Sequence, residues 1–370
     1  MTPDQQEAYD LQQSGLTRQQ IADQLGISVS SVKSRLERAR KWLAAPDGQR
    51  AAISASGLDI ERAKHGWRVV QHEDGSRDSV FWKSDQDVTD DIIDRVKDAF
   101  SDVPAHTPVE APTQRNNLLT VYPLMDAHFG MKAWGKETGY QDYDLHHAAN
   151  DMNNAFNRLF ERTPLSDTAI LILGGDTLHA DDNNHETPKS KHKLDVDGRL
   201  YKTSEVAIHS ICNAIDALCA RHAKVIVRVL MGNHDPNAHL ILQFALSARY
   251  READNVNVES AERDLYWYRH GKSLIAAHHG DKAPAQRLCM VLADSCPEWS
   301  MARDRHVLTG HIHHDSVKDF PGVKWWSLRA FCPADEYGST FGPRRALQAL
   351  TFCDKDGLVL QGIEPIWRGK

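Results

Sequence analysis

The sequence predicts an α/β fold for most of the chain, preceded by a small all-α module. Three observations support this prediction. From Leu118 onward, apolar segments rich in β-branched residues alternate with helical patterns, which is typical of folds in which helices cover a sheet. Residues 16–43 have the pattern of two short helices joined by a sharp turn. Residues 101–117 contain three prolines and no apolar periodicity, which is the composition of a linker.

The composition excludes several classes of protein. Of the 370 residues, 41% are hydrophobic and 26% are charged, so a wholly disordered chain, a collagen-like repeat and a coiled-coil rod are all excluded. The net charge is −7, so any affinity for nucleic acid must come from a local patch. No apolar run approaches the roughly 20 residues that cross a bilayer, and the first residues lack the pattern of a secretory signal. The six cysteines form no C-x-x-C pair. We therefore expect a cytoplasmic protein with reduced thiols and no membrane association.

Residues 1–45 are predicted to form a helix-turn-helix module. Thr17 is a candidate cap for a helix with apolar side chains at Ile21 and Leu25. Gly26 suits the sharp turn, because glycine adopts a positive φ at little cost. Ser28 is a candidate cap for the second helix.

The second helix, Val29 to Arg40, carries the basic residues of this module. Residues 28–41 contain five basic residues and one acidic residue. The pattern resembles the helix-turn-helix of sigma-factor promoter-binding domains, which implies that the second helix reads the major groove of DNA. The side chains expected to contact DNA are Ser30, Ser31, Lys33, Ser34, Arg35 and Arg38. The alternative is a three-helix bundle that packs on the rest of the chain or on a partner protein.

Residues 46–100 are predicted to form a small hairpin-plus-helix segment. Two aromatic and β-branched runs within residues 66–83 flank a turn at Asp74 and Gly75. The aromatic side chains could stack on bases, but completing a small core is the preferred interpretation. Residues 87–100 predict an acidic helix to which we assign no chemistry.

Five apolar, strand-like segments of residues 118–370 each lead into metal-binding side chains. Because open α/β folds place their sites at the carboxyl edge of the sheet, we expect these clusters to meet at one edge of one sheet. Period-two alternation would place Asp126 and His128 on the same side of their strand, and likewise His311 and His313. In chain order the clusters are Asp126 and His128; Asp176 and His179; Asn233, His234 and Asp235; His278 and His279; His311 and His313.

The motifs D-x-H, G-G-D-x-x-H, G-N-H-D, H-G and G-H-x-H, in this order, resemble those of the calcineurin-like metallophosphoesterase superfamily. The resemblance covers about residues 118–330 and implies a sandwich of βαβ-derived sheets flanked by helices. It implies two divalent metal ions bridged by Asp176. The first ion would be held by Asp126, His128, Asp176 and His313, and the second by Asp176, Asn233, His279 and His311.

The resemblance also implies roles for the residues beside the metals. His234 would contact the phosphate and protonate the leaving oxygen, and Asp235 would orient His234. Two ions about 3.5–4 Å apart can clamp an attacking water and a phosphoryl oxygen together. The mixed nitrogen and oxygen ligands suit Mn, Fe, Zn or Ni and do not by themselves choose among them. Mn is the first candidate. His278 and His279 are both candidates for one ligand, and the residue directly before Gly280 is preferred.

His179 bears on the substrate. The G-G-D-x-x-H block is similar to that of the double-strand-break repair nucleases of this superfamily, in which the second histidine works with the Asn-His-Asp histidine at a phosphodiester. The alternative is a histidine that orders Asp176. Residues 185–199 form an insertion whose lysines could line a phosphate path or belong to a solvated loop. The capping domain and ATPase-binding helices of those nucleases are not recognisable after residue 330, so an obligate ATPase partner is not indicated.

Together these features predict a dinuclear, metal-dependent phosphodiesterase that acts on DNA as an exonuclease or endonuclease. The helix-turn-helix would hold the enzyme near DNA through the linker, in an organisation expected of bacterial or phage DNA metabolism. Two alternatives stay open. The first is a phosphatase or cyclic-nucleotide phosphodiesterase with small substrates, and the second is a DNA-binding regulator with a structural metal site. The sequence also leaves homo-oligomerisation open.

Overall fold

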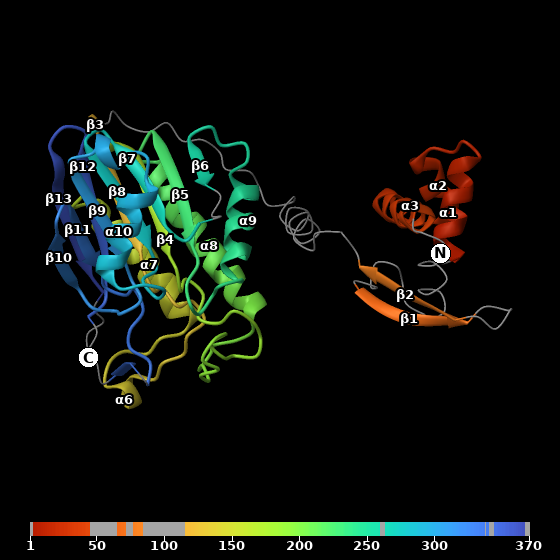
Figure 1. The fold of residues 1–370 in the computed structure, drawn as a ribbon, viewed down its shortest axis with the longest axis horizontal. Helices are drawn as coiled ribbons and strands as arrows, with labels where there is room; N and C mark the ends of the chain where they lie inside the picture. Colours follow the sequence, from red (N-terminus) through yellow and green to blue (C-terminus); the bar gives the residue numbers. More distant parts are fainter. Residues whose placement is uncertain are drawn as a thin grey trace. The chain divides into compact units, whose positions relative to one another are not determined.

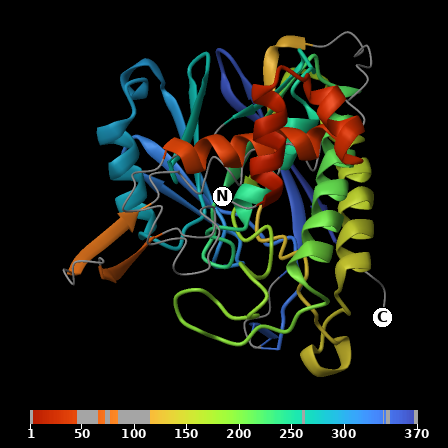
Figure 2. The same ribbon diagram turned by 90° about the vertical axis from the view of Figure 1, so that its right-hand side faces the viewer.

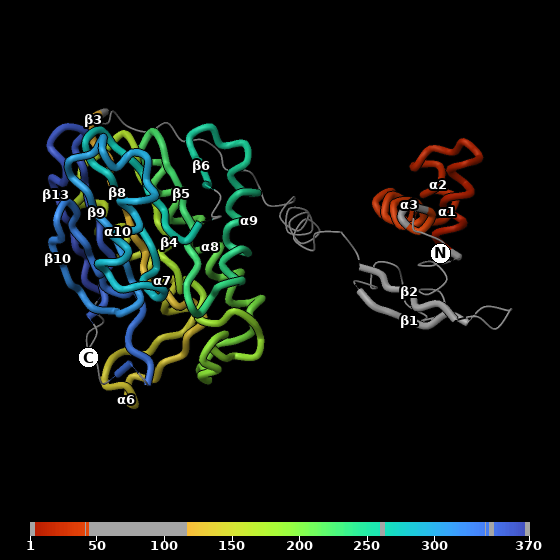
Figure 3. The backbone as a smooth tube through the Cα atoms, in the orientation of Figure 1, coloured from red at the N-terminus to blue at the C-terminus, as the bar shows by residue number. Residues whose placement is uncertain are grey.

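The structure of the protein is a computed structural model. It describes residues 3–44, the strands 65–71 and 77–83, and residues 115–259, 263–336, 338–339 and 344–366. The chain divides into two compact units, Met1–Ile92 and Ile93–Lys370. Figure 1 follows the described backbone of each unit in colour along the chain, and Figure 3 draws the backbone as a tube in the same orientation.

The first unit begins with three helices, α1 (Pro3–Gln13), α2 (Arg18–Leu25) and α3 (Val29–Ala44). Thr17 and Gln20 form a capping box at the start of α2, and Gly26 ends this helix with a φ of 64°. The N–H of Ser31 donates to Ser28 Oγ at 3.1 Å, so the serine caps α3 as predicted. The small core between the three helices consists of Ala8, Ile21, Ala22, Val32 and Leu36, with Leu25 and Ile27 partly buried against it.

A two-stranded antiparallel hairpin, β1 (His65–Gln71) and β2 (Arg77–Lys83), follows in the same unit. It begins one residue before the predicted hairpin 66–83 and ends at the same residue. The predicted turn at Asp74 and Gly75 and the predicted helix 87–100 lie outside the described residues, as does most of the linker 101–117. Strand β3 begins at Arg115, three residues before the predicted start of the α/β domain.

The second unit contains a six-stranded sheet in the order β13-β12-β3-β4-β5-β6. Strands β3 to β6 run parallel, and β12 pairs antiparallel with both β3 and β13. Pro123 lies one residue before the end of β3, as its missing N–H requires. The strands are β3 (Arg115–Leu124), β4 (Ser166–Gly174), β5 (Lys224–Leu230), β6 (Val256–Glu259), β12 (Ala346–Cys353) and β13 (Gly357–Pro365).

A second sheet has five strands in the order β10-β11-β9-β8-β7. Strands β8, β9 and β11 run parallel, and the edge strands β7 and β10 are antiparallel to their neighbours. The expectation of one sheet is therefore wrong, because the last two motif-bearing strands pair with each other and not with β3, β4 and β5. The strands are β7 (Tyr266–His270), β8 (Ser273–His278), β9 (Asp304–Thr309), β10 (Ser316–Phe320) and β11 (Val323–Ser327).

The two sheets pack face to face between helices, which confirms the predicted α/β sandwich. Along β4, Ile170 and Ile172 face the core between the sheets, while Leu171 and Leu173 face the helices. Residues 169–173 of this strand are all apolar because both of its faces are buried here. Helix α10 (Ala285–Ser295) covers the five-stranded sheet together with the 3-10 turn η1 (Trp299–Met301). The helices on the six-stranded sheet are α7 (Leu145–Phe160), α8 (Leu200–Cys219) and α9 (His239–Arg249).

Figure 2 shows α7 and α8 side by side along the sheet, and the short α6 (Gly135–Thr138) at the same end of the unit as the loop 181–199. Within the described segments, no helix has the length and apolar character needed to cross a membrane.

Candidate metal centre

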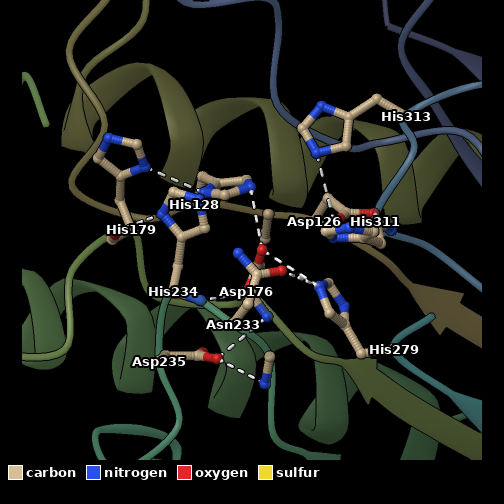
Figure 4. A network of polar contacts seen from close by, with 12 residues as sticks. Asp126, His128, Asp176, His179, Asn233, His234, Asp235, His279, His311 and His313 are labelled. Carbon is tan, nitrogen blue, oxygen red and sulfur yellow. Dashed lines mark hydrogen bonds and ion pairs between the residues drawn. The ribbon is translucent and has the colours of Figure 1, made fainter. Parts of the chain in front are cut away.

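The proposed metal ligands come from loops at the carboxyl ends of strands. Asp126 follows β3, Asp176 follows β4, and Asn233 follows β5. His279 comes directly after β8, and His311 follows β9. Figure 4 shows these side chains converging on one place, although they belong to two different sheets.

The backbone at these loops is left-handed. The non-glycine residues with positive φ in the described parts of the chain are Asp126, His128, Asp176, His185, Lys191, His311 and His313. Five of these seven are proposed metal ligands, and such a conformation costs about 1–3 kcal/mol at each position. The expected period-two alternation is wrong here, because both residue pairs lie beyond the ends of β3 and β9. Tight left-handed turns, rather than strand pleating, aim these side chains.

Asp176 lies at the centre of the cluster and is 2% exposed. Its Oδ1 accepts the N–H of His234 at 2.8 Å. Its Oδ2 lies 3.2 Å from His279 Nε2 and 3.8 Å from His128 Nε2. One carboxylate oxygen therefore faces imidazoles from two sides, which is the arrangement that a bridging ligand needs.

The first group of potential ligands comprises Asp126, His128 and Asp176, whose ligand atoms all lie within 4.8 Å of one another. His313 Nε2 is 3.4 Å from Asp126 Oδ1 and joins this side of the cluster. Nε2 of His128 is buried and has no hydrogen-bond partner among the described residues. A buried nitrogen lone pair facing a carboxylate is costly unless a cation lies between them, so this group fits a metal ion.

The second group comprises Asp176, His279 and His311, again within 4.8 Å of one another. His279 Nδ1 donates to the carbonyl of Gly174 at 3.0 Å. Its Nε2 lies 3.2 Å from Asp176 Oδ2 and 3.1 Å from Asn233 Oδ1. Because two oxygens face this nitrogen, the arrangement requires either a proton on Nε2 or a cation among the three atoms. The donor set of this group therefore also fits a metal ion.

Burial and charge shift the pKa values of these groups. Burial and the charge of nearby His234 lower the pKa of His128 well below its usual value. Burial by itself would lower the pKa of His279, but the nearby Asp176 carboxylate outweighs this effect and raises the pKa to about 10. Burial would raise the pKa of Asp176, but His279 and the other imidazoles around it lower this pKa. The centre thus keeps the Asp176 carboxylate anionic inside a shell of histidines.

Asp235 does not orient the His234 ring, contrary to the role that the resemblance implies. The His234 Nδ1–H donates to the backbone carbonyl of His179 at 2.9 Å. The Asp235 carboxylate is fully buried and accepts three backbone N–H groups, those of Asp176 at 3.1 Å, Leu178 at 3.0 Å and Gly232 at 2.9 Å. Asp235 therefore ties the loop after β4 to the loop after β5, and a carbonyl takes over the orienting contact.

His179 is buried and lies against a proposed ligand. Its Nδ1 is 3.0 Å from Nδ1 of His128, and its ring is stacked on that of His234 with 5.3 Å between centroids. Burial and the charge of His234 lower the pKa of His179 to about 3. The alternative interpretation is that His179 orders Asp176. Among the described residues the His179 side chain hydrogen-bonds with His128, whose Nε2 faces Asp176, so any such ordering would pass through the His128 ring.

The structure distinguishes the two adjacent histidines. His278 Nδ1 accepts the N–H of Gly280 at 2.9 Å, whereas the His279 side chain enters the cluster. The next histidine in the chain after His313, His314, hydrogen-bonds through Nδ1 to the carbonyl of Ile312 at 2.6 Å. It lines a cavity that opens over the cluster.

Sequence reasoning missed Cys332. Its ligand atom lies within 4.8 Å of those of His128 and His313. Burial, and then the Asp126 carboxylate, raise its pKa well above the usual value, so it is a neutral thiol. Cys332 reaches the site because its N–H donates to the carbonyl of Asp126 at 3.0 Å, a long-range contact with no sequence signature.

A cavity of about 390 Å³ opens over the cluster. Its polar lining consists of His128, Asp176, His179, Asn233, His234, His311, His313, His314 and Asp335, and the remaining lining residues are Met131, Ile312, Pro333, Ala334 and Gly338. A concave site with convergent polar groups is the usual form of an active site.

The predicted lysines of the 185–199 loop are exposed, and Lys193 Nζ lies 2.6 Å from Glu186 Oε1. None of them lines the cavity described above.

On α3, Ser30, Ser31 and Lys33 are exposed, whereas Ser34, Arg35 and Arg38 are half-buried. Arg35 Nη2 lies 3.1 Å from Asp4 Oδ2, so this arginine also links α3 to α1.

Residues 1–43 match a family model described as Sigma-70, region 4. The predicted resemblance of this segment to a sigma-factor helix-turn-helix is thereby confirmed. A search of the curated proteins finds no match to the chain.

Solved structures similar to this chain include a predicted phosphoesterase from Streptococcus pneumoniae, at 11% identity and a TM-score of 0.29, covering 67% of this chain and 98% of that one. An archaeal phosphodiesterase is similar at 12% identity and a TM-score of 0.36, covering 66% and 99%. Vps29 from Entamoeba histolytica complexed with zinc is similar at 12% identity and a TM-score of 0.29, covering 67% and 99%.

Proposed function

We propose that the chain is a dinuclear, metal-dependent phosphodiesterase that cleaves DNA and is held on DNA by its N-terminal helix-turn-helix. The single observation that supports this most is the convergence of Asp176 and six other side chains with nitrogen or oxygen ligand atoms beneath one cavity. Asp126, His128, Asp176 and His313 would hold one ion, and Asp176, Asn233, His279 and His311 the other. Manganese is the first candidate, with Fe, Zn or Ni as alternatives.

Two divalent ions bound there would supply Lewis acidity for the phosphoryl group and acidify the attacking water. The chain contributes a rigid frame for this chemistry. Asp126 accepts the backbone N–H of His311 at 3.0 Å, and Asp176 accepts that of His234 at 2.8 Å. Each carboxylate is therefore held in place by the backbone of another loop that carries proposed site residues. Such fixed positions are the preorganisation that electrostatic catalysis needs.

His234 is the proposed general acid. Because its Nδ1–H is bound to the carbonyl of His179, Nε2 is the nitrogen that exchanges a proton with the substrate. Hydrolysis breaks the bond between phosphorus and the leaving oxygen, which would take its proton from Nε2, while water supplies the new oxygen on phosphorus. His179 is proposed to act through its contact with His128 at the same side of the cavity.

The decisive experiment incubates the full chain with end-labelled single-stranded and duplex DNA in the presence of Mn²⁺. The controls are His234→Ala and a sample treated with a chelator. We expect cleavage by the wild type, loss of at least 100-fold of the rate in His234→Ala with unchanged metal content, and no cleavage with chelator.

Three results would contradict the proposal in distinguishable ways. Hydrolysis of bis-p-nitrophenyl phosphate without cleavage of DNA favours a phosphatase or cyclic-nucleotide phosphodiesterase with small substrates. Metal binding without hydrolysis of any ester favours a DNA-binding regulator with a structural metal site. Failure to retain metal after purification with added Mn²⁺ removes the proposal altogether.

A further inference from the structure

The cavity over the proposed metal centre has a distinctly apolar part. Met131, Ile312, Pro333 and Ala334 line it, and we refer to these four residues as the apolar wall. Ile312 lies between two proposed ligands and is nevertheless 50% exposed. A phosphate does not need apolar surface, so this wall faces something other than the phosphate itself.

The apolar wall is built into the site by backbone contacts. The N–H of Phe331 donates to the carbonyl of Met125 at 2.9 Å, and that of Cys332 to the carbonyl of Asp126 at 3.0 Å. Pro333 is the next residue in the chain, so these two hydrogen bonds hold it beside the Asp126 loop. The N–H of Met131 donates to the carbonyl of His128 at 3.0 Å. Each wall residue is therefore held by, or next to, a loop that carries a proposed metal ligand.

We propose that the apolar wall is a nucleoside subsite, which takes one unpaired nucleoside attached to the phosphate under hydrolysis. This inference rests on the proposed function. A group esterified to a phosphate at the proposed metal centre would lie beside the apolar wall, and the faces of a nucleobase are flat and apolar. A double helix is wider than its own major groove, which alone measures about 12 Å across, whereas the cavity has a volume of only about 390 Å³. A duplex does not enter this space, so the nucleotide arrives single-stranded or from a frayed end.

The chemistry of the wall also determines how selective it is. The side chains of Met131, Ile312, Pro333 and Ala334 carry no hydrogen-bonding N or O atom. The nearby carboxylate of Asp335 accepts the N–H of Gly338 at 2.6 Å. Apolar contact with a base face tolerates every base, so the subsite accepts any nucleoside and selects against paired ones.

The test compares two esters with the same leaving group, p-nitrophenyl thymidine 5′-phosphate and methyl p-nitrophenyl phosphate, with the full chain and Mn²⁺. The ratio of their kcat/KM values isolates the contribution of the nucleoside. We expect a ratio of about 10 or more in the wild type. Ile312→Ala and Ala334→Asp should each lower this ratio at least threefold, whereas Val359→Ala, an exposed apolar residue on β13, should keep it.

A binding measurement that does not depend on turnover accompanies the kinetics. The Kd of thymidine 5′-monophosphate should be about 3- to 10-fold weaker in Ile312→Ala than in Val359→Ala, with equal metal content and circular dichroism in both. Single-stranded DNA should also be cleaved at least tenfold faster than a blunt duplex closed by hairpins.

A wild-type ratio near one overturns the subsite, and so does a ratio that neither wall variant changes. If neither ester is hydrolysed, the proposed function fails, and the Kd of thymidine 5′-monophosphate then decides the subsite. An equal Kd in Ile312→Ala and Val359→Ala overturns it.

Discussion

The Nδ1 atoms of His128 and His179 lie 3.0 Å apart, and both side chains are buried. Two ring nitrogens at this distance share one proton. If Nε2 of His128 binds a metal, its Nδ1 carries the proton and donates it to His179. The second histidine of the G-G-D-x-x-H block then acts as the partner that fixes the orientation of a metal ligand.

This contact predicts a loss of metal affinity in His179→Ala. We expect Mn²⁺ to bind about 10- to 100-fold more weakly, measured by equilibrium titration, because an outer partner of a metal-bound histidine contributes about that much. His179→Asn keeps a side-chain acceptor near His128 and should recover most of the affinity. Equal affinity in the wild type and both variants would show that the contact does not support the metal site.

Gly232 should tolerate no side chain. A Cβ at this position would overlap Oδ1 and the backbone nitrogen of Asp176, the proposed bridging ligand. Gly232→Ala is therefore expected to retain less than half of the metal per chain by elemental analysis. Gly362→Ala is the matched control, because the tightest contact of its Cβ would be with the flexible end of Leu159 at 3.2 Å.

Asp235 is expected to matter for stability. In Asp235→Ala three buried N–H groups, at Asp176, Leu178 and Gly232, lose their acceptor. Each loss costs about 1–3 kcal/mol, so the free energy of unfolding in urea should fall by about 3 kcal/mol or more. Asp235→Asn keeps one oxygen and should lie between the wild type and Asp235→Ala. A change in activity with no change in stability in both variants would instead support a direct catalytic role.

His222 predicts a pH dependence of stability away from the metal centre. It is fully buried, its Nδ1–H donates to the carbonyl of Ser166 at 2.9 Å, and its Nε2 lies 3.2 Å from the Tyr122 hydroxyl. Burial lowers its pKa to about 4 from an ordinary value of 6.5. The unfolded chain therefore takes up a proton below pH 6.5, whereas the folded chain does so only near pH 4.

Stability contributed by neutral His222 is present above pH 6.5 and is lost as the pH falls to 4, by about 3 kcal/mol over this range. His222→Gln should show a correspondingly smaller fall in urea-unfolding stability between pH 7 and pH 4.5. His146→Gln removes an exposed histidine from α7 and serves as the matched control. A wild-type pH slope in His222→Gln would refute the assignment.

Helix α3 is expected to bind DNA through its basic face. Lys33→Ala and Arg38→Ala should each weaken binding of duplex DNA by the full chain and reduce the slope of log K against log salt by about one if the side chain contacts a phosphate. Arg287→Ala makes the same change of charge at an exposed position of α10. This variant should bind DNA as the wild type does. Salt-independent binding in all proteins would argue against the module as a DNA-binding element.

Local patterns explain why much of the fold is predictable. A helix cap involves only a few neighbouring residues. The capping roles of Thr17, Gly26 and Ser28 in α2 and α3 therefore follow from the sequence. The apolar runs before each motif are likewise local, and β3, β4 and β5 of the six-stranded sheet follow from them.

Other features depend on partners far apart in the chain. The pairing of β8 with β9, which divides the strands between two sheets, is a long-range choice that no single strand sequence contains. The contacts of Asp235 with two loops and of Cys332 with Asp126 are of the same kind.

The sequence by itself determined how the motif-bearing strands follow one another along the chain, the caps of α2 and α3, and most of the side chains gathered at the candidate metal centre, because these are properties of short segments. Only the tertiary structure decided how those side chains are aimed. The left-handed turns at Asp126, Asp176 and His311 are conformations that cost free energy locally, and they persist because the packed sandwich and its backbone hydrogen bonds hold them.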